Sequence, residues 1–147
     1  MKPFHGEIQV LNEIECIQLL ERNTTAHLGC HVHDQVYVVP ITYACEGGYF
    51  YSHSQPGKKI EMMRENNKIC IQVEEIHNFY HWKSVISTGK YEELSGDRAS
   101  TAMRLLIKKV ATQNEPESSL ELDFTAMLES AIIYRMKIDS LSGRTES

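Results

Sequence analysis

Residues 35–44, with the sequence QVYVVPITYA, have the pattern of a β-strand that is apolar on both faces. Val36 and Val38 would lie on one face of a sheet, because successive side chains of a strand point to opposite faces. The other face would carry Tyr37, Val39, Ile41 and Tyr43. A small sheet rarely buries both faces, so we expect the second face to meet a partner subunit, a ligand or both. Pro40 cannot donate a ladder hydrogen bond, which predicts a free edge or a bulge in this strand.

The segments around this strand predict a small, mainly β domain. Further strands are expected at 24–34, 48–54, 68–75, 82–94 and 131–138. Helices are expected at 11–23, 56–66, 96–112 and, as a short piece, 124–130. Tight turns at 34–35 and 46–48 would join the first three strands, which enforces antiparallel pairing. Six strands with helices between and after them fit an antiparallel barrel in one domain over residues 1–147, with a polar, frayed tail from about residue 139.

Composition excludes several classes of function. The 147 residues carry a formal net charge of -5, so the molecule as a whole is not attracted to nucleic acid or to an anionic membrane. No apolar run is long enough to span a bilayer, and the first ten residues lack the apolar segment of a signal peptide, so we expect a cytoplasmic protein. The four cysteines show no CxxC spacing, which predicts reduced, packed thiols rather than a zinc or dithiol site.

The stretch YSHSQPGKK, residues 51–59, joins the end of a predicted strand to the start of a predicted helix. Lys58 and Lys59 fall in the first helical turn, where positive side chains oppose the helix dipole. One interpretation is that they answer to an anion such as a phosphate, which helix N-termini bind readily. The other is a solvated lysine pair at a surface corner, which is the commoner case for a basic dipeptide taken alone.

Histidines and the single tryptophan have competing interpretations. His27, His31 and His33 share one face of a strand, where spacing alone would allow a metal, but a solvated face is the better interpretation and we expect no metal site. His53 could donate a proton, ligate a haem iron or simply hydrogen-bond at a strand end. Trp82 could stack on a flat ligand, close a dimer seam or fill a core.

The order of these motifs resembles the pyridoxamine 5'-phosphate oxidase-like superfamily of FMN-binding split barrels. The series runs from YVVPITYACEGGYFYSHSQPGKKIEMMRENNKICIQVEE to HWKSVISTGKYEEL, and is more closely similar to the branch of nitroimidazole-resistance flavoproteins. The resemblance implies a six-stranded split barrel with peripheral helices, which works as a homodimer with FMN in a cleft at the subunit interface. The flavin-binding residues that it implies are Val39, Pro40, Ile41, Thr42, Ser52, His53, Ser54, Lys58, Lys59, Trp82, Lys83 and Ser84.

Two departures separate this sequence from true pyridoxamine 5'-phosphate oxidases. Those enzymes usually have an arginine where Lys58 stands, and the lysine lacks the bidentate fork of a guanidinium. Their C-terminal substrate signature of tryptophan and arginines is absent from RMKIDSLSGRTES. We therefore do not expect oxidation of pyridoxamine phosphate.

The resemblance favours an FMN-dependent oxidoreductase of unassigned substrate. A nicotinamide would reduce the flavin, and a nitroaromatic or a quinone would reoxidise it, with His53 as the one candidate catalytic side chain. The alternative is a non-enzymatic protein on the same barrel that binds FMN, or haem through a histidine such as His53. A deazaflavin in place of FMN also stays open, as does a plain dimeric interaction protein.

Overall fold

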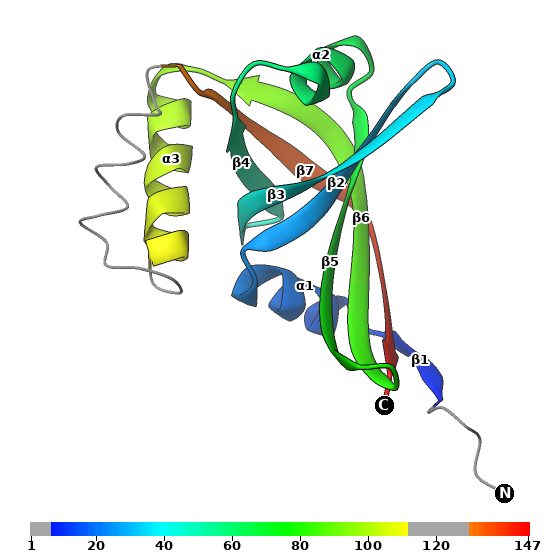
Figure 1. Ribbon diagram of the computed structural model, residues 1–147. Coiled ribbons are helices and arrows are strands. Elements are labelled where there is room, and N and C mark those ends of the chain that lie inside the picture. The colour runs from blue at the N-terminus through cyan, green and yellow to red at the C-terminus, as the bar shows by residue number, and fades with distance from the viewer. Residues whose placement is uncertain (1–6, 112–129) are drawn as a thin grey trace, which may run out of the picture.

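The computed structural model describes residues 7–111 and 130–147, which form a strongly twisted antiparallel sheet with helices on its outside (Figure 1). The strands are β1 (Ile8–Leu11), β2 (Thr25–Val32), β3 (Gln35–Glu46), β4 (Tyr49–Ser54), β5 (Lys68–Asn78), β6 (His81–Leu94) and β7 (Ile132–Glu146). The helices are α1 (Glu13–Arg22), α2 (Lys58–Glu65) and α3 (Gly96–Ala111). The mainly β prediction is confirmed, while the helical piece expected at 124–130 lies outside the described residues.

The strands close into a ring. Their order is β1-β7-β4-β3-β2-β5-β6, and β6 also pairs with β7, so β2 to β7 form a barrel with β1 attached to β7. Every pairing is antiparallel. The tight turns require this of β2–β3 and β3–β4. The first turn uses His33 and Asp34 rather than residues 34–35, and His33 takes a positive φ of 52° there.

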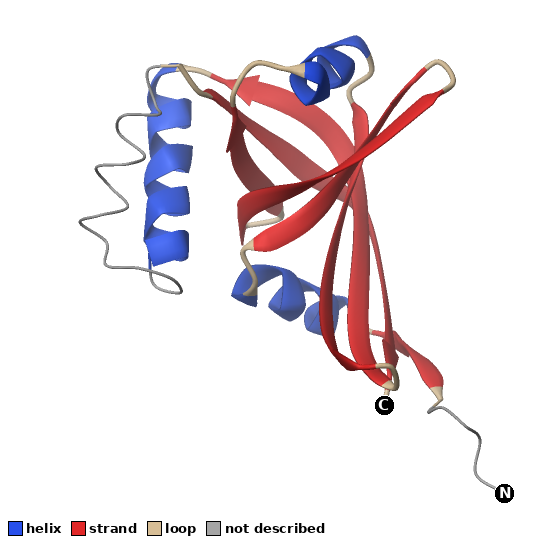
Figure 2. Cartoon of the chain, in the orientation of Figure 1, coloured by secondary structure: helices blue, strands red, loops and turns tan. Residues whose placement is uncertain are grey.

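Two apolar clusters hold the fold together. Inward side chains of the strands fill the barrel, among them the fully buried Leu28, Tyr43, Phe50, Ile71 and Met136. A smaller cluster lies between the outside of the sheet and α3, and contains Ala44, Met103, Leu106 and Ile133. Figure 2 shows α3 packed to one side of the strands and α1 near the opposite end of the barrel from α2.

The tail predicted to fray from about residue 139 is instead the second half of β7. Leu141 pairs with Ser87 of β6, and Glu146 pairs with both Trp82 and Ile8. The prediction was wrong because the inward positions of this segment include Gly143, whose missing side chain gives no apolar signal. Gly143 is buried, and a Cβ there would lie 2.6 Å from the Cys16 sulfur. The close approach of α1 therefore requires a glycine at a position where a strand ordinarily carries an inward apolar side chain.

Candidate functional site

The barrel is split where β3 and β4 part. The two strands pair only from Tyr43–Ser52 to Glu46–Tyr49, whereas β3 pairs with β2 all the way from Thr42 to Gln35. Residues 35–42 of β3 therefore have a strand on one side only. Of the free edge or bulge predicted at Pro40, the structure shows the free edge.

Hydrogen-bond alternation shows which backbone groups face this free edge. The Tyr43 N–H donates to the Thr24 carbonyl at 2.8 Å, so odd-numbered residues of β3 turn their backbone groups to β2. Even-numbered residues, including Pro40 and Thr42, turn theirs to the free edge. Pro40 thus costs no ladder bond to β2. Of the residues expected along the flavin, Val39 and Ile41 bond to β2 and pack their side chains against the barrel core.

The end of β4 is tied to this edge by a side chain. Ser52 Oγ donates to the Thr42 carbonyl at 2.6 Å, and Ser52 is only 2% exposed. Ser54 Oγ donates to the Gln55 carbonyl at 2.7 Å, at the start of the corner that leads into α2. Both serine hydroxyls thus donate to backbone carbonyls, and these bonds hold the backbone in place at the corner.

The N-terminus of α2 opens beside the split. Gly57 is its N-cap residue and offers no side-chain cap, while the Gly57 carbonyl accepts the first helical bond from Glu61 at 3.1 Å. The first amide N–H groups of a helix have no partner within the helix, and they carry a partial positive charge. This corner can therefore receive an anion without displacing a capping side chain.

Lys58 and Lys59 leave the helix start in different directions, because neighbouring helical residues point about 100° apart. The Lys58 ammonium lies 4.9 Å from the centre of the Tyr37 ring, over the part of β3 with the free edge. Lys59 is half-buried, and burial lowers the pKa of its ammonium because a desolvated charge is disfavoured. The two predicted lysines are thus brought together with β3.

Lys59 is close enough to affect the titration of both His53, which pairs with Ile133 on the α3 side of the sheet, and Cys30, which lies in the barrel core. Burial is the larger cause that lowers the pKa of His53, and the positive charge of Lys59 lowers it further. Burial raises the pKa of the Cys30 thiol, against which Lys59 and Lys58 act in the opposite direction. At neutral pH we therefore expect His53 to be a neutral imidazole and Cys30 to be a thiol. Lys59 is then an ammonium whose charge is disfavoured by burial and would be stabilised by an anion.

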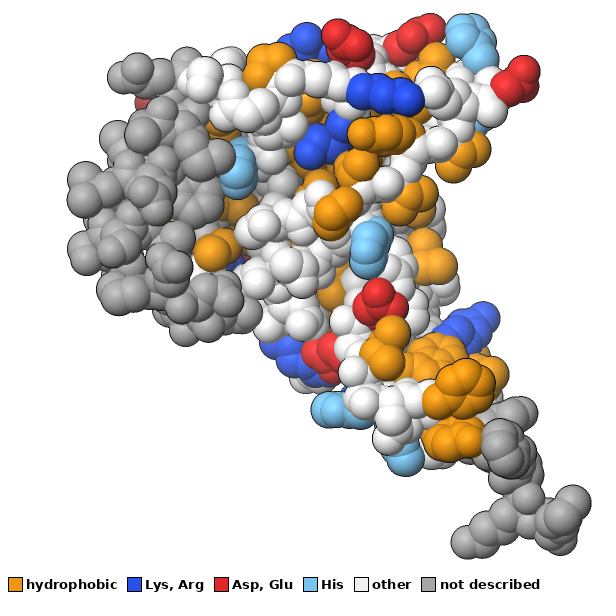
Figure 3. All heavy atoms as spheres, in the orientation of Figure 1, with side chains coloured by type: hydrophobic (Ala, Val, Ile, Leu, Met, Phe, Trp, Pro, Cys, Tyr) orange, Lys and Arg blue, Asp and Glu red, His pale blue; other side chains and the backbone are white. Residues whose placement is uncertain are grey.

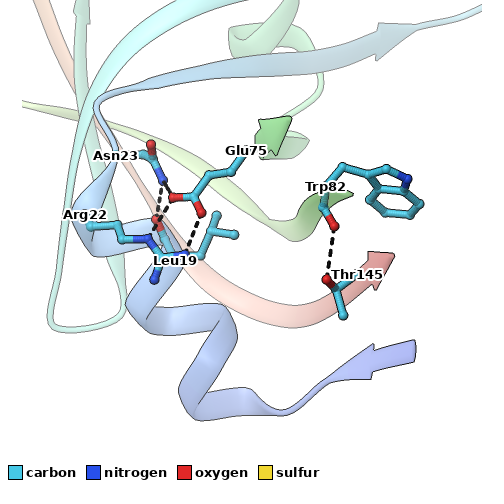
Figure 4. A network of polar contacts seen from close by, with 6 residues as sticks. All are labelled: Leu19, Arg22, Asn23, Glu75, Trp82 and Thr145. Atoms are coloured by element: carbon cyan, nitrogen blue, oxygen red, sulfur yellow. Dashed lines mark hydrogen bonds and ion pairs between the residues drawn. The ribbon is translucent and has the colours of Figure 1, made fainter. Parts of the chain in front are cut away.

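Trp82, Lys83 and Ser84 lie elsewhere in the same chain. They open β6 at the far end of the long β5–β6 hairpin, well away from α2 (Figure 1). The Trp82 indole donates to Glu146 at 2.8 Å. The Trp82 carbonyl accepts from Thr145 at 3.0 Å (Figure 4). The Ser84 hydroxyl accepts from Gln72 at 3.0 Å. Within one chain, Trp82, Lys83 and Ser84 therefore lie apart from the predicted site residues at the start of α2.

An ion-pair network ties the far end of this hairpin, close to Trp82, to α1 (Figure 4). Arg22 donates two hydrogen bonds to Glu75, at 2.7 and 2.6 Å, and Asn23 donates another at 2.7 Å. These bonds lower the pKa of Glu75 to about 2, with the Arg22 hydrogen bond as the largest cause. The network orients the hairpin on which Trp82 sits.

Sequence reasoning missed Tyr37, Cys30 and Glu146 as neighbours of the predicted site residues. Tyr37 and Cys30 are brought to the lysines by the β2–β3 hairpin, and a parity pattern marks them only as inward residues. Glu146 is 6% exposed and lies in the segment that was expected to fray. The one available signal was Tyr37, an aromatic residue on the strand with the proline.

The predicted histidine face is exposed. His27 lies near Gln72 and Glu74, and His33 lies 3.4 Å from Glu65 at the surface turn. In the described part of the chain, no three His, Cys, Asp or Glu side chains gather where they could hold a metal ion. Within residues 7–111 and 130–147, no helix is long and apolar enough to cross a membrane.

A family model described as pyridoxamine 5'-phosphate oxidase matches residues 12–145, nearly the whole chain. The chain belongs to this family. The predicted superfamily and the split-barrel fold are thereby confirmed. Family membership leaves the cofactor, the substrate and the branch to be argued from the site.

Two relatives of this family match the chain over almost its full length. An uncharacterised protein of Rhizobium meliloti (strain 1021) is 34% identical over 142 residues, which are 93% of this chain and 94% of that one. The crystal structure of an FAD-binding protein from Mesorhizobium loti is 32% identical, covers 95% of this chain and 99% of that chain, and has a TM-score of 0.77.

A third relative shares the fold at lower identity. The crystal structure of a putative 5-nitroimidazole antibiotic resistance protein from Bacteroides thetaiotaomicron is 16% identical, with a TM-score of 0.71 over 99% of this chain and 95% of that chain. At this identity the likeness extends to the split barrel of the family alone.

Proposed function

We propose that the protein binds FMN in the split between β3 and β4, with the flavin phosphate at the N-terminus of α2. The observation that carries this is the meeting of an uncapped helix start, two diverging lysines and a strand edge without a neighbour. Lys58 and Lys59 would hold the phosphate, and Ser54 and His53 would lie beside it. The edge-facing backbone of Pro40 and Thr42 would run along the ring system.

The residues present fit such a group. Burial disfavours the charged form of Lys59, and a phosphate dianion nearby would stabilise that charge. The free edge offers carbonyl oxygens and N–H groups, which suit a planar ring that both donates and accepts hydrogen bonds. Lys58 supplies a point charge in place of an arginine fork, so charge and the helix N–H groups would carry the binding.

We further propose that the protein is a homodimer with the flavin at the subunit interface. Trp82, Lys83 and Ser84 lie far from Lys58 and Lys59 within one chain, yet the family resemblance places both groups beside the flavin. A partner subunit could bring its own β6 residues to the split. The apolar outer face of β3 supports such a partner.

The activity that we infer is that of an FMN-dependent oxidoreductase of unassigned substrate. Bound flavin would supply hydride and electron transfer between a nicotinamide and a small electrophile such as a nitroaromatic or a quinone. This chain would orient the ring by its β3 edge and anchor the phosphate at α2. His53 is the candidate catalytic side chain, since its lowered pKa keeps the imidazole neutral at neutral pH, with one nitrogen as a donor and the other as an acceptor.

FMN and FAD share the phosphate that this corner would bind. The Mesorhizobium loti relative is described as FAD-binding, so the length of the nucleotide is a finer question than flavin binding itself. Assignment to the nitroimidazole-resistance branch is likewise a proposal, which rests on the ordered motifs from the VVP strand to WKSV.

The deciding experiment is the visible spectrum of the freshly purified protein, followed by chromatography of the released cofactor. We expect flavin absorption bands and FMN on extraction. Lys58→Ala combined with Lys59→Ala should weaken FMN binding at least tenfold, whereas Lys108→Ala on the exposed surface of α3 should leave it unchanged. A protein that carries no flavin and binds none on titration would refute the proposal.

One observation favours a second candidate, haem binding without catalysis. A neutral imidazole is the form that ligates iron, and the lowered pKa of His53 keeps it neutral. A Soret band that His53→Ala removes would select this alternative, and flavin bands that survive His53→Ala would exclude it.

A further inference from the structure

Three lysines form a row across the sheet beyond the end of α2. Lys68 at the start of β5 pairs in register with Lys90 of β6, which pairs with Lys137 of β7. Each lysine adjoins a residue of the barrel core, namely Ile69, Tyr91 or Met136. All three lysines therefore point to the outside of the barrel, because successive side chains of a strand alternate. Neighbouring strands lie about 4.8 Å apart, so the row spans about 10 Å.

This row is unfavourable for the chain taken by itself. Like charges directly opposite each other on neighbouring strands are destabilising. Among the residues that the structure describes, no carboxylate forms an ion pair with Lys68, Lys90 or Lys137. The chain as a whole carries a net charge of -5, so the row is a local cluster of cations on an acidic protein. Such a cluster attracts anions.

A hollow of about 350 Å³ lies beside the row, over β4, β6 and β7. Lys90 and Lys137 line this hollow, together with Tyr49, Asn67 and Arg135. Its volume falls within the range of small-molecule sites. An anion in the hollow would thus be partly enclosed and would lie next to two of the three lysines.

Arg135 is the least exposed cation of the hollow. Its side chain is only 19% exposed, and its guanidinium lies 4.4 Å from the centre of the Tyr49 ring. Arg135 also donates a hydrogen bond to Glu92, so the charge of this carboxylate is balanced within the sheet. The guanidinium is therefore held in place by the chain itself, and Lys90 and Lys137 are left to meet a ligand.

Asp139 is the other carboxylate among the residues that line the hollow in the described part of the chain. A bulge in β7 places it there, because Gly89 pairs with Ile138 while Thr88 pairs with Ser140. A β-bulge inserts one extra residue and redirects its side chain. The negative charge of Asp139 opposes an anion, so the site favours a ligand with several negative charges over a singly charged one.

The row is separate from the exposed apolar surface and from the candidate flavin site. Figure 3 shows apolar side chains gathered at the lower end of the molecule, where β1 and the β5–β6 hairpin end. Lys68 and Lys90 lie at the other end of the β5–β6 pairing. Lys58 and Lys59 begin α2, whereas Lys68 follows the end of that helix. The eight residues of α2 make it about 12 Å long, so the two groups of lysines lie beyond opposite ends of it.

We propose that the row and its hollow, here named the lysine-row site, bind a chain of two or three phosphate groups. Such a chain carries several negative charges over an extended length, which matches cations on three neighbouring strands. Lysine suits this ligand because its ammonium is a point charge on a flexible stem and can reach phosphate oxygens from different directions. A nucleotide and inorganic polyphosphate present this same chemistry.

Titration calorimetry with inorganic tripolyphosphate tests the lysine-row site. The protein carries Lys58→Ala and Lys59→Ala, which remove the start of α2 as a competing phosphate site. Lys90→Gln combined with Lys137→Gln should then weaken binding at least about tenfold, because two charge-assisted hydrogen bonds to phosphate are lost. Absence of tripolyphosphate binding before these two lysines are changed would overturn the proposal.

Two further variants separate a specific site from general attraction by charge. Arg104→Gln combined with Lys108→Gln removes the same charge from exposed positions on α3 and should change the affinity less than about twofold, because salt screens exposed charges outside the hollow. Asp139→Asn should strengthen binding at least about twofold, because a negative charge beside the phosphates is removed. An equal loss of affinity in the α3 variant and in the Lys90 and Lys137 variant would overturn the proposal.

NMR of the wild-type protein gives a measurement that depends on no variant. Tripolyphosphate should shift the backbone amide signals of Lys90, Lys137 and Asn67 with one common saturation curve, and signals that do not move would overturn the site. Titration with ADP and with inorganic pyrophosphate, which carry equal numbers of phosphates, then distinguishes the sources. Tighter binding of ADP supports a nucleotide in the lysine-row site, and equal binding supports inorganic polyphosphate there.

Discussion

The Ser52 hydroxyl donates a 2.6 Å hydrogen bond to the Thr42 carbonyl at the point where β3 and β4 part. The strand ladder between β3 and β4 stops at the Tyr43–Ser52 pair, so this side-chain bond is the next link after the last backbone pair. It fixes the mouth of the split in which the candidate site lies.

Ser52→Ala should therefore loosen the mouth of the split and destabilise the fold. Ser52 is buried, and the variant would leave the edge-facing carbonyl of Thr42 without this donor. The expected loss in the free energy of unfolding is about 1 kcal/mol, measured by urea denaturation without added cofactor. Ser100→Ala, on the exposed surface of α3, is the control and should change little. Equal stability of the Ser52→Ala variant and the wild type would contradict the assigned role.

The titration of His53 should report on an anion at α2. Burial and the Lys59 charge lower the pKa of His53 below its usual 6.5 in the free protein. A bound phosphate would raise this pKa, because a negative charge favours the imidazolium. Proton NMR of the imidazole with and without FMN measures the change, and the exposed His31 serves as internal control. An unchanged or lower pKa of His53 on FMN binding would argue against phosphate at this corner.

The same shift predicts a pH dependence of stability in the free protein. Between pH 6.5 and the lower folded pKa, the unfolded chain takes up the His53 proton first, so the free energy of unfolding falls as the pH falls. Above pH 6.5 both states are neutral at this residue and its contribution is flat. His53→Asn should reduce this decline, as urea denaturation at pH 7.5 and pH 5.5 can show.

Glu75 should stabilise the far end of the β5–β6 hairpin at neutral pH. Its folded pKa of about 2 lies below the usual 4.5, so the stabilisation is present above pH 4.5 and is lost as the pH falls towards 2. Arg22 is partly exposed, so solvent screening reduces the effect to about 1 kcal/mol. Glu75→Gln should cost that amount at pH 7 and much less at pH 2.5. Glu46→Gln, at an exposed position, should cost little at either pH.

Gly89→Ala should destabilise the pairing of β6 with β7. A Cβ at residue 89 would lie 2.0 Å from the Lys137 carbonyl oxygen and 2.8 Å from the Met136 side chain, so the backbone would have to shift. We expect a loss of about 2 kcal/mol or more in the free energy of unfolding. Gly57→Ala is the matched control for stability, because no heavy atom lies within 4 Å of its added Cβ. A Gly89→Ala protein with wild-type stability would refute the close approach.

Much of the fold was predictable because its early strands have strong local patterns. The segment with Pro40 predicted a free edge or a bulge and a second apolar face outside the core, and the structure has the free edge and the apolar outer face. The second half of β7 was not predictable, because it owes its order to contacts far along the chain, with β6 and with Cys16 of α1. Its polar composition alone is that of a tail.

Part of the candidate site was predictable because its residues also form a distinctive local sequence pattern. Lys58 and Lys59 stood out because cations at a helix start conflict with the helix dipole. Tyr37 and Cys30 gave no such conflict, since inward aromatic and thiol side chains are ordinary in a barrel. The distance between Lys58 and Trp82 could not be seen from their order in the sequence, because it depends on how far the β5–β6 hairpin extends.

The unpaired edge of β3 carries a hazard that Pro40 limits. A strand with one open side is a template for another chain, and eight residues without a neighbour are enough to start an intermolecular ladder. Pro40 turns its missing N–H to that side, so an incoming strand would meet a gap in the middle of the row of donors. A small planar molecule needs no continuous row. The edge is thus open to a ligand and guarded against fibril growth by the same residue.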